Sequence, residues 1–483
     1  MSPRRRNPVP ALVVLALVPA LALGAMWRFA DGKAPDEVVE ATLDSSALAV
    51  PPVLPTALLS VRRAPATLAR DVNLSSFQAD LQPLLDAIDS TSCIAVSLDG
   101  QPVAAKNELV PLRPASNVKL ATADVALDVL GADFTYTTTV TGTIGTDGVV
   151  NGDLYLVGGG DPLLSNSWWK GPNAKFPPFN VTSIEELADA VVAAGVTNVT
   201  GRVVGDASRY DDEWYAPTWS KDIRFSEGGP ISALLVNDSR EQIDKSSNDP
   251  AEGAAQVLTD LLRERGVVVA NAPVAGKAGV ATVIASVQSQ PLPAVLDEML
   301  TTSDNNTAEM VLKEIGLKAG AGATREAGLA VVLDRLQGWG IPMEGVTLVD
   351  GSGLSDENRF TCAALLALLQ RGTVDDAIGA GLPVAGAAGG TLADSFTDTA
   401  MAGVLRAKTG TLNNADGVDN KPGSKALSGY VPVDGGGAIE FTLLLNGETI
   451  TTRSTGFGPI WDLLAEVFGT YPSGPTVADL APR

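Results

Sequence analysis

The sequence contains no histidine among its 483 residues, and this absence excludes several kinds of catalytic site. Neither a Ser-His-Asp nor a Cys-His unit can form, and zinc, haem or iron sites with a histidine ligand are equally excluded. Cysteine is scarce as well, because Cys93 and Cys362 are too few for a metal cage built from thiolates. If the protein is an enzyme, its general base must be a lysine, an aspartate, a glutamate or a tyrosine.

Positive charge is also in short supply, since 34 Lys and Arg residues stand against 56 Asp and Glu residues, a net charge of −22. A surface this acidic repels nucleic acid and anionic lipid, so we expect no nucleic-acid partner. Apolar residues make up 45% of the chain, which is typical of a globular protein. A chain of this length is expected to form about three domains.

The amino terminus has the pattern of an export segment. Three consecutive arginines at positions 4–6 precede an uncharged stretch, residues 7–27, which is rich in Val, Leu and Ala. The part from 8 to 27 is also long enough to remain as a membrane anchor, the only membrane contact we expect. Residues 1–30 are therefore predicted to be a signal peptide or an anchor, and residues 31–70 a linker. The protein is expected outside the cytoplasm, in the cell envelope or secreted.

The two cysteines bear on the same question, because an oxidising compartment would allow them to pair. Cys93 lies in a strand-like run, and Cys362 begins a helical one. A disulfide between them and two separate buried thiols both remain open.

Hydrophobic periodicity divides the chain into two end segments and a different middle segment. The end segments predict helices over 81–88, 114–130, 292–300, 307–319, 325–338, 361–371 and 459–468, and strands over 93–98, 102–106, 404–408, 428–433 and 438–446. The middle predicts a β meander over 135–156, strands over 197–204 and 267–269, and helices over 184–194 and 256–265. We therefore expect an α+β fold, in which residues 71–134 and 291–483 form an antiparallel sheet covered by helices, split by β-rich inserted domains over 135–290.

Without histidine, a serine nucleophile needs another base. Lysine can serve when its amine is desolvated or lies beside another cation, because the neutral form is then accessible near pH 7. Ser116 and Lys119 lie one turn apart on the same face of the predicted helix over 114–130. In the first turn, the backbone N–H of Ser116 is free to donate, and the helix dipole favours a developing anion. Alone, the Ser-x-x-Lys pattern is weak, since about one chance match is expected in a chain of this size.

Two further motifs make the pattern specific. Ser303-Asp304-Asn305 precedes a predicted helix, where by itself it is more often a helix cap. Lys408-Thr409-Gly410 ends a predicted strand, where by itself it is more often an ordinary strand end. All three motifs in this order, on a helix, a loop and a strand, are typical of penicillin-binding proteins and class A β-lactamases.

The chain resembles the low-molecular-mass class C penicillin-binding proteins, the D-alanyl-D-alanine carboxypeptidase/endopeptidase family of the peptidase S13 type. The resemblance extends through Pro114–Leu120, Val157–Pro162, Ile231–Leu234, Ala308-Glu309, Asp350–Ser355, Leu382–Val384, Gly390–Leu392 and Ser428–Tyr430. The long gap between Ser116 and Ser303 resembles this family, which carries extra domains there, and not the compact β-lactamases. It implies a penicillin-binding-protein/β-lactamase-like transpeptidase domain split by two nested inserts.

Chemistry and resemblance together imply the roles of the motif residues. Ser116 would attack the carbonyl of the penultimate D-alanine, and Lys119 would take its proton. Lys408 would lower the pKa of Lys119 as a second cation and attract the terminal carboxylate of the substrate. Ser303 would relay a proton to the leaving amine, and Asn305 would hold the substrate amide and the Lys119 ammonium.

The strand that follows Lys408 would bind substrate. Thr409 offers a hydroxyl to the carboxylate, Gly410 allows the substrate backbone to pair closely, and the N–H groups of Ser116 and Thr411 would form the oxyanion hole. The implied substrates are peptidoglycan stem peptides, with β-lactams as covalent inhibitors. The resemblance implies neither a metal nor a cofactor.

Three features bear on specificity. Asn306 stands where the family usually has an apolar residue, and the polar segment 413–425 is expected to form an extended hairpin loop beside the site. Trp168, Trp169, Trp214 and Trp219 lie in the insert, where ordinary packing is favoured over an aromatic shelf for peptide or glycan.

Two other functions are considered. A β-lactamase is disfavoured because no glutamate on a recognisable loop is available for fast deacylation. A catalytically silent cell-wall binding or scaffold protein of the same fold would be expected to lack some of the five motif residues, and all five are present.

Overall fold

A computed structural model describes residues 64–171, 175–221, 223–224, 226–242, 245–413, 423–433 and 437–480. The predicted export segment and the predicted linker up to residue 63 lie outside these ranges, as do residues 414–422 of the predicted hairpin loop. Within the part of the chain that is described, no helix is long and apolar enough to cross a bilayer.

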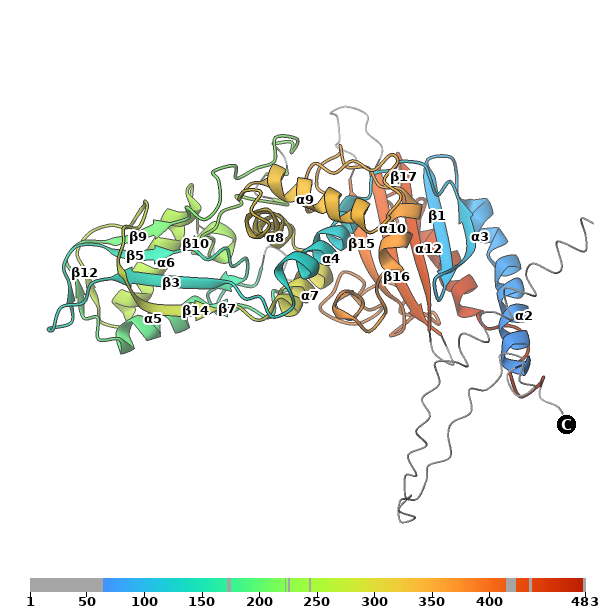
Figure 1. The fold of residues 1–483 in the computed structure, drawn as a ribbon, viewed down its shortest axis with the longest axis horizontal. Coiled ribbons are helices and arrows are strands. Elements are labelled where there is room, and N and C mark those ends of the chain that lie inside the picture. The colour runs from blue at the N-terminus through green and yellow to red at the C-terminus, as the bar shows by residue number, and fades with distance from the viewer. Residues whose placement is uncertain are drawn as a thin grey trace, which may run out of the picture. The chain divides into compact units, whose positions relative to one another are not determined.

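The central sheet has five antiparallel strands in the order β15-β16-β17-β1-β2 (Figure 1). The strands are β15 (Arg406–Leu412), β16 (Gly423–Pro432), β17 (Ala438–Gly447), β1 (Ser92–Leu98) and β2 (Gln101–Lys106). Strands from the two end segments meet inside this sheet, where β1 pairs with β17 from Ser92↔Leu445 to Leu98↔Ile439. Every residue of β1 is buried, as expected for a strand that is covered on both faces.

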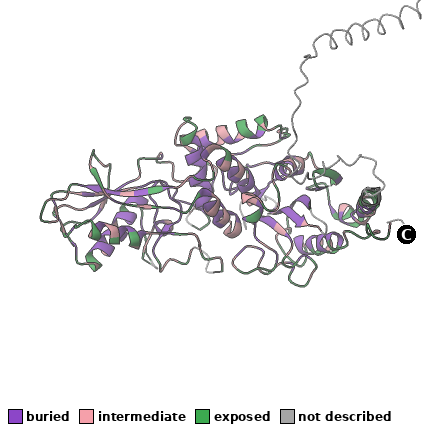
Figure 2. Cartoon of the chain, turned by 60° about the horizontal axis from the view of Figure 1, so that its bottom comes forward, coloured by how far each residue is buried: buried purple, intermediate pink, exposed green. Residues whose placement is uncertain are grey.

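A separate hydrophobic core lies on each face of this sheet. One contains residues of α4 (Val118–Leu130), α7 (Leu292–Thr302), α8 (Asn305–Lys318), α9 (Arg325–Gly338), α10 (Cys362–Leu369) and α11 (Ala377–Ala380). The other contains residues of α2 (Ala64–Asp80), α3 (Gln82–Ala87) and α12 (Phe457–Gly469). Because side chains alternate along a strand, Cys93 joins the first core and Ile94 the second. Figure 2 shows that the helices of the molecule carry both buried and exposed stretches, as expected of helices that cover a core. The prediction of an α+β fold is confirmed.

The two cysteines form a disulfide, which settles the alternative that the sequence left open. Cys93 on β1 and Cys362 at the start of α10 have Cα atoms 6.1 Å apart and are 269 positions apart in the chain. Both are fully buried in the first core. The bond therefore links the helical layer to β1, an interior strand of the sheet.

The insert is built around a second, mixed sheet in the order β13-β9-β5-β3-β14. The insert as a whole contains the strands and helices β3 (Thr137–Gly142), β4 (Val149–Val150), β5 (Leu154–Val157), β6 (Leu164–Ser165), β7 (Thr182–Ser183), α5 (Ile184–Ala193), β8 (Asn198–Val199), β9 (Val203–Asp206), β10 (Arg240–Gln242), β11 (Lys245–Ser246), α6 (Pro250–Glu264), β12 (Val268–Val269), β13 (Val274–Ala275) and β14 (Thr282–Gln288). β3 and β5 pair antiparallel as a meander requires, but β5 pairs with β9 in parallel. The crossover through α5 makes this parallel pairing possible.

Several boundaries differ from the sequence predictions. α2 begins at Ala64 and so includes residues 64–70, which the sequence assigns to the linker. Its buried face carries the polar Asn73 while Leu68 and Val72 are exposed, so hydrophobicity alone does not show the helical period. α6 begins at Pro250 and not at 256, because Asp249 caps its first turn. β16 begins at Gly423, so residues 423–425 belong to a strand and not to the predicted loop.

Candidate active site

Ser116 lies in a single 3-10 turn, η1 (Ala115–Asn117), which leads directly into α4. Ala115 has φ 47°, in the left-handed region that a residue with a side chain rarely adopts. The turn is held by close packing, since a β-carbon at Gly353 would lie 1.9 Å from the Ala115 carbonyl oxygen. This packing presents Ser116 at the wall of a cavity.

Lys119 reaches Ser116 from the next turn of the helix. Its Nζ lies 3.0 Å from Ser116 Oγ, 2.6 Å from Asn305 Oδ1 and 2.7 Å from the Ser352 carbonyl oxygen. The side chain is fully buried, and burial lowers the pKa of Lys119 to about 8, against the opposing effect of nearby carboxylates, of which Asp304 is the strongest. A substantial fraction of the amine is therefore neutral near pH 7.5 and able to take a proton from Ser116.

A second lysine and serine form a matching pair in the same site. Lys408 on β15 donates to Ser303 Oγ (2.8 Å) and to the Thr409 carbonyl oxygen (2.9 Å). Ser303 joins α7 to α8 with φ 67°, and it lines the cavity. Burial, and next Lys119, hold the pKa of Lys408 well below its usual value. The sequence predicted that Lys408 lowers the pKa of Lys119, but burial is the main cause of that shift.

β15 is the edge strand beside η1 and lines the cavity with Thr409, Gly410 and Thr411. The Thr409 hydroxyl is 2.8 Å from the hydroxyl of Thr391, a second cavity residue. A β-carbon at Gly410 would lie 2.9 Å from the Pro114 carbonyl oxygen, so glycine is needed here for packing against the nucleophile's turn. This is a different reason from the close substrate pairing that the sequence suggested.

The cavity has a volume of about 730 Å³ and is lined by both parts of the chain. The insert contributes residues of its loops around 162–165, 226–229 and 237–240. Trp169 lines this wall, with the Arg240 guanidinium 5.7 Å from its ring centre, whereas Trp219 is buried by packing. Among the described residues, no group of three or more Cys, Asp or Glu side chains is placed to hold a metal ion.

The insert also contacts the Ser303-Asp304-Asn305 motif directly. Asn305 Nδ2 donates to the Glu227 carbonyl oxygen (2.6 Å), which fixes the amide so that its oxygen faces Lys119. The next residue, Asn306, accepts from the Gly229 N–H (2.6 Å) and donates to Asp238 Oδ1 (2.9 Å). Asn306, which stands where the family usually has an apolar residue, therefore connects α8 to two insert loops.

Replacing Asn306 by leucine should destabilise the protein by about 1–3 kcal/mol, because the buried Gly229 N–H and the Asp238 carboxyl lose their partners. Acylation should slow as well, since Gly229 adjoins the segment that orients Asn305. Thermal unfolding and acylation rates of N306L, D238A and the double variant test this. A coupling energy near zero between the two sites would contradict the contact.

Several residues of the site were not singled out from the sequence. The Ser352 carbonyl and the Glu227 carbonyl are backbone groups, and side-chain motifs carry no signal for them. Thr391 and Glu309 lie within stretches that support the family resemblance, but nothing in their spacing shows what they contact. The five predicted catalytic residues do come together, as Ser116-Lys119-Asn305 and as Ser303-Lys408.

The fold and the site, with a serine hydroxyl beside a buried lysine amine, are those expected of a serine acyl-transfer enzyme. The chain belongs to the D-Ala-D-Ala carboxypeptidase 3 (S13) family, whose sequence model matches residues 72–245 and 237–464. It is a serine-type D-alanyl-D-alanine carboxypeptidase. The prediction of this family and of an enzyme is confirmed.

Two characterised relatives and one solved structure illustrate the similarity. Carboxypeptidase DacB of Mycolicibacterium smegmatis is 33% identical over 374 residues, which cover 71% of this chain and 74% of the relative. The D-alanyl-D-alanine carboxypeptidase of Actinomadura sp. is 30% identical over 499 residues, covering 84% and 87%. The crystal structure of penicillin binding protein 4 from Haemophilus influenzae shares the fold, with a TM-score of 0.64, 19% identity, and coverage of 82% and 98%.

Proposed function

We propose that this protein acts outside the cytoplasm on peptidoglycan stem peptides, as a carboxypeptidase and endopeptidase that works through an acyl-serine intermediate and is acylated by β-lactams. The observation that carries the proposal is the contact of 3.0 Å between Ser116 Oγ and a buried Lys119 amine at a large cavity. The β-lactam complex of the Haemophilus influenzae protein concerns a chain of the same fold.

Acylation begins when Lys119 takes the proton of Ser116. The Ser116 oxygen forms a bond to the carbonyl carbon of the penultimate D-alanine, and the carbonyl oxygen becomes an anion. The N–H groups of Ser116 and Thr411 stabilise that anion, because each lies on an element that lines the cavity.

The peptide C–N bond then breaks, and its electron pair goes to the nitrogen of the departing D-alanine. Ser303, which is held by a hydrogen bond from Lys408, relays to this nitrogen the proton that Lys119 took from Ser116, so Lys119 is again a neutral amine. Water next attacks the ester, gives a proton to Lys119, and releases the shortened peptide as Ser116 recovers its proton. Asn305 holds the substrate amide while its oxygen stays on Lys119.

The terminal carboxylate of the substrate binds beside β15. Lys408 supplies positive charge there, and Thr409 and Thr391 supply hydroxyl donors on the cavity wall. The carboxylate of a β-lactam would take the same place. The strand β15 thus carries residues that bind the substrate and residues that take part in the reaction.

We also propose the domain division and location that the sequence suggests. Residues 71–134 and 291–483 form the transpeptidase-like domain, 135–290 the inserts, and 1–30 a signal peptide or anchor. The disulfide supports an oxidising compartment, because such bonds are rare in the cytoplasm of most cells.

Intact-protein mass spectrometry after exposure to benzylpenicillin tests the function. The chain from residue 31 onward should gain the mass of one benzylpenicillin, and S116A should gain none. Release of D-alanine from a stem pentapeptide should be lost in the same variant. Penicillin consumption without an adduct would indicate a β-lactamase, and neither adduct nor consumption would indicate a silent wall-binding protein.

A further inference from the structure

A buried loop lies behind the catalytic amine. The 350–355 loop, from Asp350 to Ser355, is buried almost completely, and its Ser352 carbonyl oxygen accepts from Lys119 Nζ at 2.7 Å. Gly353 of the same loop packs on the nucleophile's turn. The loop therefore contacts both the base and the segment that carries the nucleophile.

The contact between Lys119 and the Ser352 carbonyl oxygen matters because the amine carries a limited number of hydrogens. A protonated Lys119 has three N–H bonds, which match its three acceptors: Ser116 Oγ, Asn305 Oδ1 and the Ser352 oxygen. The neutral amine has only two N–H bonds and one lone pair. When Asn305 and Ser352 occupy the two N–H bonds, the lone pair must point at the Ser116 hydroxyl.

The two acceptors are held by the same helix. Asn305 is the first residue of α8, and Glu309 lies one turn later on the same face. Glu309 Oε1 accepts from the N–H of Gly351 (2.9 Å) and from the N–H of Ser352 (2.8 Å). These two bonds fix the peptide units beside the Ser352 carbonyl.

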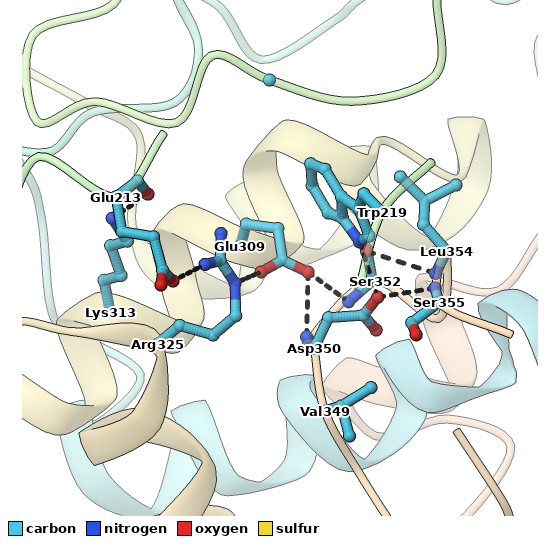
Figure 3. A network of polar contacts seen from close by, with 12 residues as sticks. Glu213, Trp219, Glu309, Lys313, Arg325, Val349, Asp350, Ser352, Leu354 and Ser355 are labelled. Atoms are coloured by element: carbon cyan, nitrogen blue, oxygen red, sulfur yellow. Dashed lines mark hydrogen bonds and ion pairs between the residues drawn. The ribbon is translucent and has the colours of Figure 1, made fainter. Parts of the chain in front are cut away.

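Glu309 is in turn held by Arg325, a buried residue at the start of α9 that also pairs with Glu213 of the insert (Figure 3). Its second oxygen accepts from Arg325 Nε at 2.8 Å, and Arg325 forms an ion pair with Glu213. Trp219 of the insert donates from Nε1 to Asp350 Oδ2 (2.8 Å) at the start of the loop. Glu309 and Arg325 are both buried, and stability alone does not explain this ion pair, because a buried ion pair is often no more stabilising than apolar residues of similar size.

We propose that Glu309 is a positioning residue of this enzyme: it holds the Ser352 carbonyl so that the neutral Lys119 amine directs its lone pair at Ser116. The proposal rests on the function proposed above, in which Lys119 is the base. Glu309 touches neither substrate nor Ser116, so it acts through the loop.

Glu309→Gln tests the proposal, with Glu314→Gln as the matched control. Glu314 is an equally buried carboxylate on α8, but it pairs with Arg209 and Tyr210 and not with the loop. We measure acylation by benzylpenicillin per active site, its pH profile and the melting temperature. Glu309→Gln should acylate roughly 10- to 100-fold more slowly, as expected for a misplaced catalytic group. Glu314→Gln should stay within about twofold of the wild type when compared at a temperature where both are folded.

The pH profile separates positioning from a general loss of stability. The carboxylates that act on Lys119 are Asp304, Asp350, Glu309 and Glu227, and each raises its pKa. Removing the charge of Glu309 should therefore move the midpoint of the acylation profile to lower pH, while the plateau falls. An unfolded fraction would lower the number of active sites without moving the midpoint.

Thr122 supplies a second test without a change of charge. Its hydroxyl donates to the Gly351 carbonyl oxygen at 2.8 Å and so braces the same loop from α4. Thr122→Val should slow acylation with an unmoved midpoint, and Thr122→Ser should restore the rate. The proposal is overturned if Glu309→Gln acylates like the wild type, or if Glu314→Gln slows equally. Failure of the wild type to acylate, with S116A as reference, would instead overturn the proposed function.

Discussion

Replacing Lys119 by methionine should slow acylation of Ser116 by benzylpenicillin about 10³-fold, within the range expected for losing a general base. Methionine is similar in length but has no amine to accept the Ser116 proton. Lys119→Arg should fail as well, because a guanidinium is not deprotonated in proteins. A positive charge at this position is therefore not sufficient for acylation. Slow acylation in both variants would identify the neutral amine as the form of Lys119 that the reaction requires.

The pH dependence of acylation provides the measurement. The wild-type rate should rise with pH and level off above the Lys119 pKa of about 8, since only the neutral amine acts as a base. The residual rate of Lys119→Met should not follow this titration. Lys313→Met is the control, because it removes an equally buried lysine that pairs with Asp211 away from Ser116. Equal losses in both variants would show that burial of a lysine, and not its chemistry, matters.

Removing the disulfide should have the largest effect on stability. The double variant Cys93→Ala/Cys362→Ala should lose about 2–5 kcal/mol, because the bond closes a very long loop and so restricts the unfolded chain. At about 2–4 °C per kcal/mol for a large domain, the melting temperature should fall by roughly 4–20 °C. Neither cysteine lines the cavity, so the folded variant should still be acylated at 25 °C.

A reductant distinguishes the bond from ordinary packing. The melting temperature of the wild type should fall toward that of the double variant when dithiothreitol is present, and the double variant should not respond. Titration of thiols in the unfolded, unreduced wild type should find none. Two free thiols, or a wild type that does not respond to reductant, would contradict the pairing of Cys93 and Cys362.

The sequence predicted most of the elements that carry the site because their signals are local. The three motifs lie on a helix start, a helix junction and a strand, and the periodicity of each element is clear over its own length. The antiparallel sheet and its helices follow from the order of these elements. Because the sequence has no histidine, only a few residue types could act as the general base, and this favoured the Ser116-Lys119 pair as a catalytic site.

The contacts that complete the site depend on tertiary packing, and no local pattern reports them. The amide of Asn305 is oriented by a backbone carbonyl of the insert, about eighty positions earlier in the chain. Burial is the main cause of the lowered Lys119 pKa. The sequence offered both desolvation and the nearby Lys408 as causes, but it cannot measure how deeply a side chain is buried. In the insert, the parallel pairing of β5 with β9 was missed because short strands do not reveal their partners.

The place of β17 in the central sheet has a consequence for how the molecule is made. β1 leaves the ribosome well before its neighbour β17, which ends at Gly447 and follows the whole insert in the chain. Contacts between such distant segments form late, because closing the intervening loop costs entropy before pairing returns any stability. The insert lies wholly between them and has its own core, so it can fold while the sheet is still open. Ser116, Ser303 and Lys408 are thus expected to come together only after β17 has been synthesised, and a chain that stops before β17 is expected to lack the assembled site.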